Sequence, residues 1–356
     1  MAPSFVRAHV REMDGYLPGE QPAFGERVVK LNTNENPFPP SPKVMQAVRE
    51  LEAEALRRYP QPLADTFRQS AAKMLGIEPS MILAGNGSDD LLTIATRTFV
   101  GPGGVLAFPH PTYSLYSVLA KLETASAVAV PWKPNWVLPV DALLDAKPSA
   151  IYLANPNAPS GTLVPPTDVE KLATRFKGLL LVDEAYVDFA DANCLSLPQR
   201  LENVVVTRSL SKSYSLAGLR FGYAVAAPSV IAEMAKVKDS YNCDALSIVA
   251  ATAAIQDQDY AAATWRHVRE ERERLSAELS AIGFDVIPSH ANFVLAGVPG
   301  GDARSLYLGL KSQGILVRYF DQPELRDKLR ITIGTSTENN ALLSGLRALL
   351  ASEKAA

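Results

Sequence analysis

The chain is poor in cysteine and in histidine. Its 356 residues include only two cysteines, Cys194 and Cys243, which are too few for a disulfide framework and fit a reducing cytoplasm. The four histidines stand singly in the sequence, without the spacing that zinc ligands show. We therefore expect a cytoplasmic protein without a metal site, and the sequence argues against a metallohydrolase.

An excess of charge of one sign is also missing. The chain has 35 Lys and Arg against 38 Asp and Glu, a net charge of −3. Because polyanion binders concentrate basic residues on one face, nucleic acids and anionic membrane surfaces are poor candidate partners. Residues 1–15 lack the apolar run of a secretory signal, and the longest charge-free stretch, 98–120, is broken by prolines and glycines. We expect small molecules as partners and no membrane span.

What the chain does contain is an alternation of short β-rich runs with helical patterns. Such runs occur at 81–84, 105–108, 127–130, 151–154, 179–182, 204–207 and 223–226. Several are continuously apolar, which is typical of parallel strands covered by helices on both faces. The sequence therefore predicts an α/β fold with a seven-stranded, mostly parallel sheet sandwiched by helices.

The pattern changes after Trp265, where a long charged helix is expected over 265–282. Short strands at 285–287, 293–296, 315–319 and 329–333 follow, with a helix from Asp302 to Gly314 and a final helix capped by Thr337. We expect a large α/β domain over 41–264 and a small α+β domain over 265–356. The N-terminal arm, 1–40, is too short for a core of its own and is expected to pack on the small domain and a subunit interface.

One candidate site residue, Asp183, stands at the end of the apolar run 179–183. Ligands of open α/β sheets bind at the carboxyl ends of the strands, where a carboxylate can hold the proton of a heterocyclic ring nitrogen. An Asp that only caps the following turn is an equally good interpretation of this motif alone.

A second candidate, Lys212, follows the apolar run 204–207 within a Ser-rich, barely charged segment. Desolvation and a nearby arginine lower the pKa of such an amine toward that of a usable imine-forming group. Arg220 lies eight residues on, and its guanidinium can bind a phosphate together with the hydroxyls of Ser209 and Ser211. The spacing predicts an anchored phosphate beside a reactive amine.

Three further motifs are weaker when taken singly. The loop Gly85-Asn-Gly87-Ser88-Asp89 opens a predicted helix and could bind an anion through free N–H groups, or could be a simple cap. Asn157 in an Asn-Pro-rich turn could donate to a ring oxygen, and Tyr113 could stack on a planar ring.

Together the motifs resemble the aspartate-aminotransferase-like superfamily, pyridoxal-phosphate enzymes of fold type I, and within it the histidinol-phosphate aminotransferase family. The resemblance covers nearly the whole chain. It rests on Leu31-Asn-Thr-Asn-Glu-Asn36-Pro-Phe, Arg58-Tyr59-Pro, the Gly87 loop, Asp183-Glu-Ala-Tyr186, Ser209-Leu-Ser-Lys212 with Arg220-Phe-Gly, and Leu329-Arg330-Ile-Thr-Ile-Gly-Thr.

The resemblance implies a role for each matching residue. Lys212 bonds covalently to pyridoxal 5'-phosphate, Asp183 pairs with its pyridine nitrogen, and Tyr186 reaches the ring oxygen. The remaining cofactor-binding residues are Gly87, Ser88, Asp89, Tyr113, Asn157, Ser209, Ser211, Arg220 and, in the neighbouring subunit of a homodimer, Tyr59. The implied substrate-binding residues are Tyr16, Asn36, Arg318 and Arg330. In the family an Asn stands where this chain has Ala158, so Asn157 is assigned that role with the pattern shifted by one residue.

The implied reaction transfers the amino group of histidinol phosphate to 2-oxoglutarate, giving imidazole acetol phosphate and glutamate, in histidine biosynthesis. An aromatic amino-acid aminotransferase or a threonine-phosphate decarboxylase would share the same cofactor residues. A serine acyl-enzyme is a rival from another class, because Ser209 and Lys212 satisfy the S-x-x-K spacing. It is disfavoured because the Ser-Asp-Asn and Lys-Thr-Gly motifs are both missing.

Overall fold

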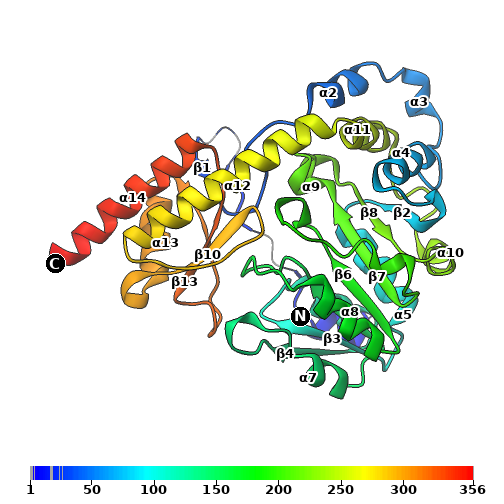
Figure 1. The fold of residues 1–356 in the computed structure, drawn as a ribbon, viewed down its shortest axis with the longest axis horizontal. Helices are drawn as coiled ribbons and strands as arrows, with labels where there is room; N and C mark the ends of the chain where they lie inside the picture. Colours follow the sequence, from blue (N-terminus) through cyan, green and yellow to red (C-terminus); the bar gives the residue numbers. More distant parts are fainter. Residues whose placement is uncertain (1–2, 4, 17–18, 24, 26, 356) are drawn as a thin grey trace.

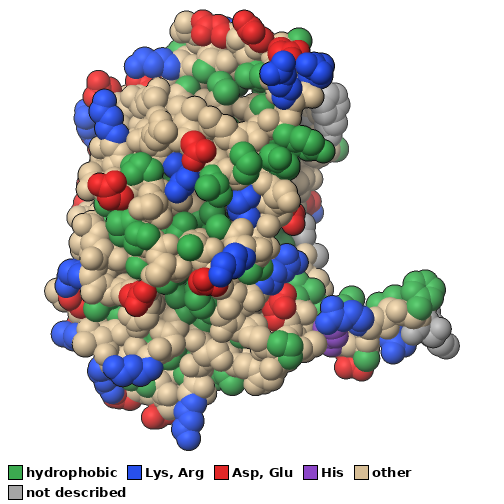
Figure 2. Space-filling view, turned by 90° about the vertical axis from the view of Figure 1, so that its right-hand side faces the viewer, with side chains coloured by type: hydrophobic (Ala, Val, Ile, Leu, Met, Phe, Trp, Pro, Cys, Tyr) green, Lys and Arg blue, Asp and Glu red, His purple; other side chains and the backbone are tan. Residues whose placement is uncertain are grey.

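Figure 1 shows the computed structural model, which describes residues 3, 5–16, 19–23, 25 and 27–355. The predicted N-terminal arm includes 1–2, 4, 17–18, 24 and 26, which lie outside the described residues. No described helix is both long and apolar enough to cross a bilayer. Within the same described part, no group of three metal-binding side chains comes together. On the face drawn in Figure 2, basic and acidic side chains are interspersed.

A seven-stranded sheet forms the centre of the larger part of the molecule. Its order is β2-β8-β7-β6-β5-β3-β4, and β8 alone runs antiparallel to its neighbours. The strands are β2 (Ile82–Gly85), β3 (Val105–His110), β4 (Ser126–Pro131), β5 (Ala150–Ala154), β6 (Leu179–Asp183), β7 (Val204–Ser209) and β8 (Gly222–Val225). The seven predicted strands and the mostly parallel sheet are thereby confirmed.

Helices cover both faces of this sheet (Figure 1). Along β6, Leu179 and Leu181 enter one apolar cluster, while Leu180 and Val182 enter another. Successive side chains of a strand point to opposite faces, so both faces are buried and the strand reads as continuously apolar. The helices of this part are α2 (Pro42–Arg49), α3 (Ala53–Arg57), α4 (Asp65–Leu75), α5 (Ser88–Phe99), α6 (Leu115–Leu122), α7 (Val140–Asp145), α8 (Pro166–Arg175), α9 (Leu210–Ser213), α10 (Pro228–Val237) and α11 (Ala245–Gln256).

The long helix α12 (Gln258–Ala281) connects this part to a second sheet (Figure 1). It begins seven residues before the predicted start at Trp265, directly after Asp257. The second sheet is antiparallel, in the order β12-β13-β10-β9. Its strands are β9 (Asp285–Ile287), β10 (Phe293–Gly297), β12 (Arg318–Tyr319) and β13 (Lys328–Thr332), and it packs with α13 (Ala303–Ser312) and α14 (Ser336–Ala355).

Two local predictions for the C-terminal part need correction. The predicted strand 315–319 is divided, because β11 (Ile315–Leu316) pairs with β1 (Val29–Lys30) and only β12 joins the four-stranded sheet. Thr337 does not cap the last helix. Thr335 and Glu338 form a reciprocal capping box instead, in which the Glu338 N–H donates to Thr335 Oγ1 and the Thr335 N–H donates to Glu338 Oε2.

The described part of the N-terminal segment packs on both parts of the molecule. Strand β1 joins β11, and Glu20 pairs with Lys311 of α13, as the prediction of packing on the C-terminal unit requires. Farther toward the N-terminus, α1 (Ala8–Glu12) lies against α6, and Tyr16 contacts Tyr113 edge to face at 5.8 Å. Within one chain, residues 8–16 thus lie against the larger part of the molecule, and the subunit interface expected for the arm stays a prediction.

Candidate active site

Asp183 is the last residue of β6, at the carboxyl end of the parallel strands, and is 5% exposed. No cation faces it at ion-pair distance among the described residues. Instead it accepts hydrogen bonds from the hydroxyls of Tyr116 (2.9 Å) and Thr207 (3.3 Å). Burial, together with the nearby charge of Asp89, raises the pKa of this carboxyl to about 6, although its hydrogen bonds act in the opposite direction. A buried carboxylate without a cation is poised to pair with a cationic ligand.

Sequence analysis missed Tyr116, whose side chain is fully buried on α6. Its ring contacts Tyr113 edge to face, with centroids 5.7 Å apart. Tyr113 stands before α6, and its carbonyl accepts the Tyr116 N–H at 3.3 Å. The only sequence signal for Tyr116 is that a second tyrosine follows Tyr113 by three residues. Tyr116 fixes the orientation of the Asp183 carboxylate.

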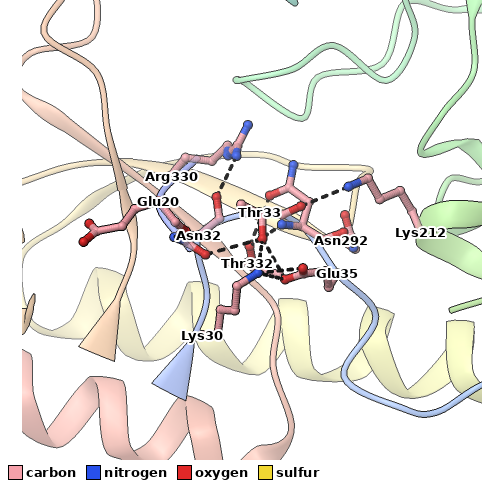
Figure 3. Close-up of polar contacts among 10 residues, drawn as sticks. Glu20, Lys30, Asn32, Thr33, Glu35, Lys212, Asn292, Arg330 and Thr332 are labelled. Carbon is pink, nitrogen blue, oxygen red and sulfur yellow. Dashed lines mark hydrogen bonds and ion pairs between the residues drawn. The ribbon is translucent and has the colours of Figure 1, made fainter. Parts of the chain in front are cut away.

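Lys212 lies on α9, a single helical turn that follows β7 without a loop. The turn is capped by Ser209, whose Oγ accepts the N–H of Ser211 at 3.2 Å. Nζ of Lys212 donates to the carbonyl oxygen of Thr33 at 2.9 Å (Figure 3). Burial and the charge of Arg330 lower the pKa of this amine to about 8. Lys212 therefore gives up its proton more readily than an exposed lysine does.

Arg220 and the N-terminus of α5 lie close together at one end of the site. Nη1 of Arg220 donates to Ser211 Oγ at 3.2 Å, and Nη2 lies 3.5 Å from Asp89 Oδ2. The backbone of Gly87 has φ +86°, and a Cβ there would lie 2.7 Å from Arg220 Nη2. The positive φ favours glycine here, and without a side chain at residue 87 the guanidinium can lie close to the start of α5. A helix N-terminus next to an arginine has the donor set that a phosphate requires.

Tyr113 and Asn157 lie beside this end of the site. The hydroxyl of Tyr113 donates to Asp89 Oδ1 at 3.0 Å. Asn157 is fully buried, and its amide donates to the carbonyl of Pro111 at 3.2 Å and to Ser160 Oγ at 2.9 Å. Both of its hydrogens thus have acceptors within the chain, and a bond to a ring oxygen would require the release of one. The role of Asn157 in the cofactor site stays a prediction.

On the side of the four-stranded sheet, Arg330 of β13 is the central residue. Its Nη2 donates to the carbonyl of Asn32 at 3.0 Å (Figure 3). Its guanidinium lies 5.3 Å from the ring centre of Phe293 and 5.5 Å from that of Phe320. Nε is buried and has no hydrogen-bond partner among the described residues. A buried, unpaired donor on a guanidinium indicates a place for an acidic ligand group.

The other predicted substrate-binding residues differ in how directly they contact the site. Arg318 lies on β12 in register with Arg330, and its guanidinium is 5.3 Å from the ring centre of Phe320. Asn36 donates to the carbonyl of Ser213, next to Lys212, at 3.3 Å. Tyr16 reaches the site through Tyr113. The structure therefore brings residues of the N-terminal segment and both sheets together.

Tyr59 is not brought into this group within one chain. Its side chain is 81% exposed and stacks on Tyr241, with ring centroids 4.5 Å apart.

Glu184, the residue after Asp183, has a different role that sequence analysis did not assign. It is fully buried, accepts two hydrogen bonds from Arg208 (3.0 and 2.8 Å), and also accepts the backbone N–H of Cys194. This ion pair ties the loop after β6 to β7 and thereby supports Asp183. Of these two consecutive carboxylates, Asp183 has no cation at ion-pair distance in the described chain, whereas Glu184 is paired with Arg208.

Comparison with known sequences agrees with this geometry. The profile of the family described as "Aminotransferase class I and II" matches residues 26–346. The chain is 47% identical over 347 residues to histidinol-phosphate aminotransferase 1 of Trichormus variabilis, covering 98% of this chain and 99% of that protein. It is also 47% identical over 341 residues to histidinol-phosphate aminotransferase of Rhodopirellula baltica, covering 95% and 93% of the two chains.

Two solved structures are similar over most of their length. The histidinol-phosphate aminotransferase from Sinorhizobium meliloti, in complex with pyridoxal-5'-phosphate, has a TM-score of 0.89 at 26% identity, covering 98% of this chain and 99% of that one. The L-threonine-O-3-phosphate decarboxylase from Porphyromonas gingivalis has a TM-score of 0.80 at 22% identity, covering 91% and 99%, and at that identity the likeness shows the fold alone.

The fold and the site define a fold type I enzyme of the transaminase class. The chain belongs to the class I and II aminotransferase family and, within it, to the histidinol-phosphate aminotransferases. The family, the fold and the enzyme class predicted from the sequence are confirmed.

Proposed function

We propose that this enzyme transfers the amino group of histidinol phosphate to 2-oxoglutarate, with pyridoxal 5'-phosphate as cofactor, as a step of histidine biosynthesis. The observation that carries the proposal is the buried amine of Lys212, which donates to the carbonyl oxygen of Thr33 at 2.9 Å and whose pKa is lowered to about 8 by burial and the charge of Arg330. The names of the relatives favour histidinol phosphate over other amino donors.

The residues present fit the cofactor at both of its ends. The donors of Arg220, Ser211 and the α5 N-terminus suit its phosphate, with Gly87, Ser88 and Asp89 at the start of α5 and Ser209 at the end of β7. The carboxylate of Asp183, which no cation neutralises at ion-pair distance in the described chain, suits its protonated pyridine nitrogen. Tyr113 would stack on the ring, Tyr186 would donate to the ring oxygen, and Asn157 would lie beside it. When bound, the cofactor supplies an electron-poor ring that accepts the electron pair of the breaking Cα–H bond.

The chain's own groups move and hold the protons. Nζ of Lys212, neutral in part at physiological pH, accepts the proton that leaves the substrate Cα. Asp183 holds a proton at the ring nitrogen, and Tyr116 and Thr207 keep its carboxylate oriented. Arg330 binds the acidic group of the substrate through its unpaired Nε, and Arg318, Tyr16 and Asn36 complete the pocket for a phosphate or a carboxylate.

We also propose that two chains form a homodimer in the cytoplasm. The ring of Tyr59 is exposed within one chain and would reach the cofactor phosphate of the other subunit. The helix α1 buries none of its own residues, which suits an arm that packs on a partner. The two cysteines are free and buried, which fits a reducing compartment. Residues 41–264 would then form the cofactor-binding domain and 265–356 the small domain.

The serine acyl-enzyme is disfavoured by the contacts of its two candidate groups. Ser209 Oγ accepts the Ser211 N–H, and Lys212 Nζ donates to Thr33 O. A serine nucleophile needs a hydrogen-bonded base, and this base is directed elsewhere.

The substrate assignment is tested with a panel of amino donors and 2-oxoglutarate, with glutamate formation as the readout. We expect kcat/KM for histidinol phosphate to exceed that for phenylalanine and tyrosine by at least about tenfold, since its phosphate gains charge-assisted bonds that these two amino acids cannot make. Phosphothreonine shares the phosphate, so a lower kcat/KM for it would show that the imidazole ring is recognised as well. Equal values across the panel would contradict the assignment. Release of carbon dioxide from phosphothreonine without glutamate formation would instead establish the decarboxylase.

A further inference from the structure

Asn34 occupies an unusual backbone position next to the site. It is 1% exposed, and its φ of +57° lies in the left-handed region. Asn and Asp adopt that region more readily than other residues with a side chain. Its backbone N–H donates to Thr332 Oγ1 at 3.0 Å, and its carbonyl accepts the amide of Asn292 at 2.9 Å. Thr332 of β13 and Asn292, directly before β10, thus hold the backbone of Asn34 on the four-stranded sheet, which we call the small sheet.

The hydrogen bonds around Asn34 fix which way its amide points. Thr332 Oγ1 already accepts the Asn34 N–H, so its single hydrogen is free to donate, and it lies 3.1 Å from Asn34 Oδ1. A flipped amide would place NH₂ there and leave the buried threonine hydrogen without an acceptor. Oδ1 therefore faces Thr332, and Nδ2 faces the hydroxyl oxygen of Tyr186 at 3.0 Å.

This orientation determines what the Tyr186 hydroxyl can do. A phenol has one hydrogen, and an amide NH₂ group offers no acceptor. Because Asn34 donates to the phenol oxygen, the phenol hydrogen must point away from Asn34. We propose that Asn34 is a positioning residue that directs the Tyr186 hydroxyl hydrogen toward the ring oxygen of the cofactor. The inference rests on the proposed function, because it takes the cofactor ring to lie against Tyr186.

The neighbouring residue extends the same connection. The carbonyl of Thr33 accepts Nζ of Lys212 (Figure 3), while the side chain of Asn34 donates to Tyr186. Lys212 and Tyr186 follow strands β7 and β6 of the large sheet, whereas Asn34 is bound to Thr332 of β13. Two consecutive residues thus connect the small sheet to two groups of the cofactor site.

The decisive variant is Asn34→Asp. It keeps the size of the side chain and the tolerance for a positive φ, but a carboxylate only accepts hydrogen bonds. The hydroxyl hydrogen of Tyr186 would then bond to the carboxylate of residue 34, and the hydrogen bond to the ring oxygen of the cofactor would be lost. Asn34→Gly is the second variant, since glycine adopts this backbone freely and leaves the hydroxyl unconstrained. Tyr186→Phe removes the hydroxyl itself and is the matched reference.

The readout is the pH midpoint of the visible absorption band of the bound cofactor, measured with the rate of cofactor release. When no group donates a hydrogen bond to the ring oxygen, that oxygen keeps more negative charge. It then stabilises the proton on the neighbouring nitrogen that joins Lys212 to the cofactor, so this proton is lost only at higher pH. We expect Asn34→Asp and Tyr186→Phe each to raise the midpoint by about 0.5–1 pH unit, the size of one ordinary hydrogen bond. Asn34→Gly should shift it by less. A wild-type midpoint and release rate in Asn34→Asp would overturn the proposal.

The double variant separates positioning from a general structural effect. If Asn34 acts through the hydroxyl, Asn34→Asp should add almost nothing to the midpoint shift of Tyr186→Phe. Full additivity of the two shifts would overturn the proposal, because Asn34 would then act independently of Tyr186. Failure of the proposed function is distinguishable, since the wild-type enzyme itself would then bind no cofactor and show no visible band.

Discussion

The polar groups that the two sheets place at the site differ in whether they have hydrogen-bond partners within the chain. At the carboxyl ends of the seven-stranded sheet, polar groups are bonded to one another: Asp183 to Tyr116 and Thr207, and Arg220 to Ser211. On the four-stranded sheet, Arg330 keeps a buried Nε without a partner among the described residues. One region is held by its own hydrogen bonds, and the other, in the proposed function, is completed by the substrate.

This difference matches two requirements of a transaminase, which must hold its cofactor in place and also bind and release its substrates. The cofactor site has to hold one molecule in one orientation, which a rigid network of hydrogen bonds does well. The substrate site has to accept and release different acids in turn, and a cation stacked on Phe293 and Phe320 can do so without breaking an internal ion pair. Variants in the two regions should therefore affect different kinetic constants.

The largest effect is expected at Lys212. Lys212→Ala should lower kcat by at least about 10⁴-fold, since in the proposed mechanism the residue both binds the cofactor and carries the proton. Cofactor binding should persist in part through the phosphate contacts. Lys171→Ala is the control, because that lysine is exposed on α8 and pairs with Asp168. Comparable turnover in both variants would remove Lys212 from the mechanism.

Arg330 should produce the next largest effect, and mainly in KM. Arg330→Met keeps the length of the side chain but removes the charge, and should raise KM for the acidic substrate about 10²-fold, the size of one or two charge-assisted hydrogen bonds. Arg326→Met, an exposed position in the same segment, is the matched control. A fall in kcat at constant KM would contradict the prediction, because Arg330 would then act in the chemical step and not in binding of the acidic substrate.

Asp183 provides the test of pH dependence, measured by chemical unfolding of cofactor-stripped protein. Its folded pKa of about 6 lies above the ordinary 3.8. Its stabilising contribution is therefore present below pH 4 and is lost as the pH rises through 6. Asp183→Asn, which cannot ionise, should raise the free energy of unfolding at pH 8 by about 1–3 kcal/mol and lower kcat of the reconstituted enzyme.

The neighbouring carboxylate should behave in the opposite way. Glu184→Gln removes the negative charge that faces the buried Arg208 at 2.8 Å and leaves, among the described residues, only Asp188 at 3.6 Å, so it should lower the free energy of unfolding by about 3 kcal/mol. If the two variants change stability in the same direction at pH 8, Asp183 is a paired structural residue like Glu184.

The smallest expected effect concerns the last helix. Thr335→Ala removes the capping box and should lower the free energy of unfolding by about 1 kcal/mol. Thr337→Ala, at an exposed position in the first turn, should change it by less than about 0.5 kcal/mol. Calorimetry of both variants decides between the two capping positions, and the reverse order would restore the cap that the sequence suggests.

The seven-stranded sheet could be predicted because its strands are local in sequence. Each strand is a short apolar run bounded by turn residues, and both faces are covered by helices, so hydrophobicity alone marks it. Lys212, Asp183 and Arg220 could be found for a similar reason, because Asp183 ends strand β6, Lys212 closely follows β7, and Arg220 immediately precedes β8.

The parts that the sequence left unassigned depend on contacts between distant residues. Asn34 is oriented by Thr332, 298 residues away, and β11 separates from β12 because β1 pairs with it. No pattern within the segment 31–36 reveals which side chain faces Tyr186. The capping box at Thr335 was local, and it was missed only because Thr337 also fits a helix start.

The most direct test of the account is to locate the lysine that bears the cofactor. Enzyme incubated with pyridoxal 5'-phosphate, reduced with borohydride and digested should give a single cofactor-modified peptide, containing Lys212, and the yellow colour should bleach. Modification of another lysine, or none at all, would contradict the assignment of the reactive amine on which the proposed mechanism depends.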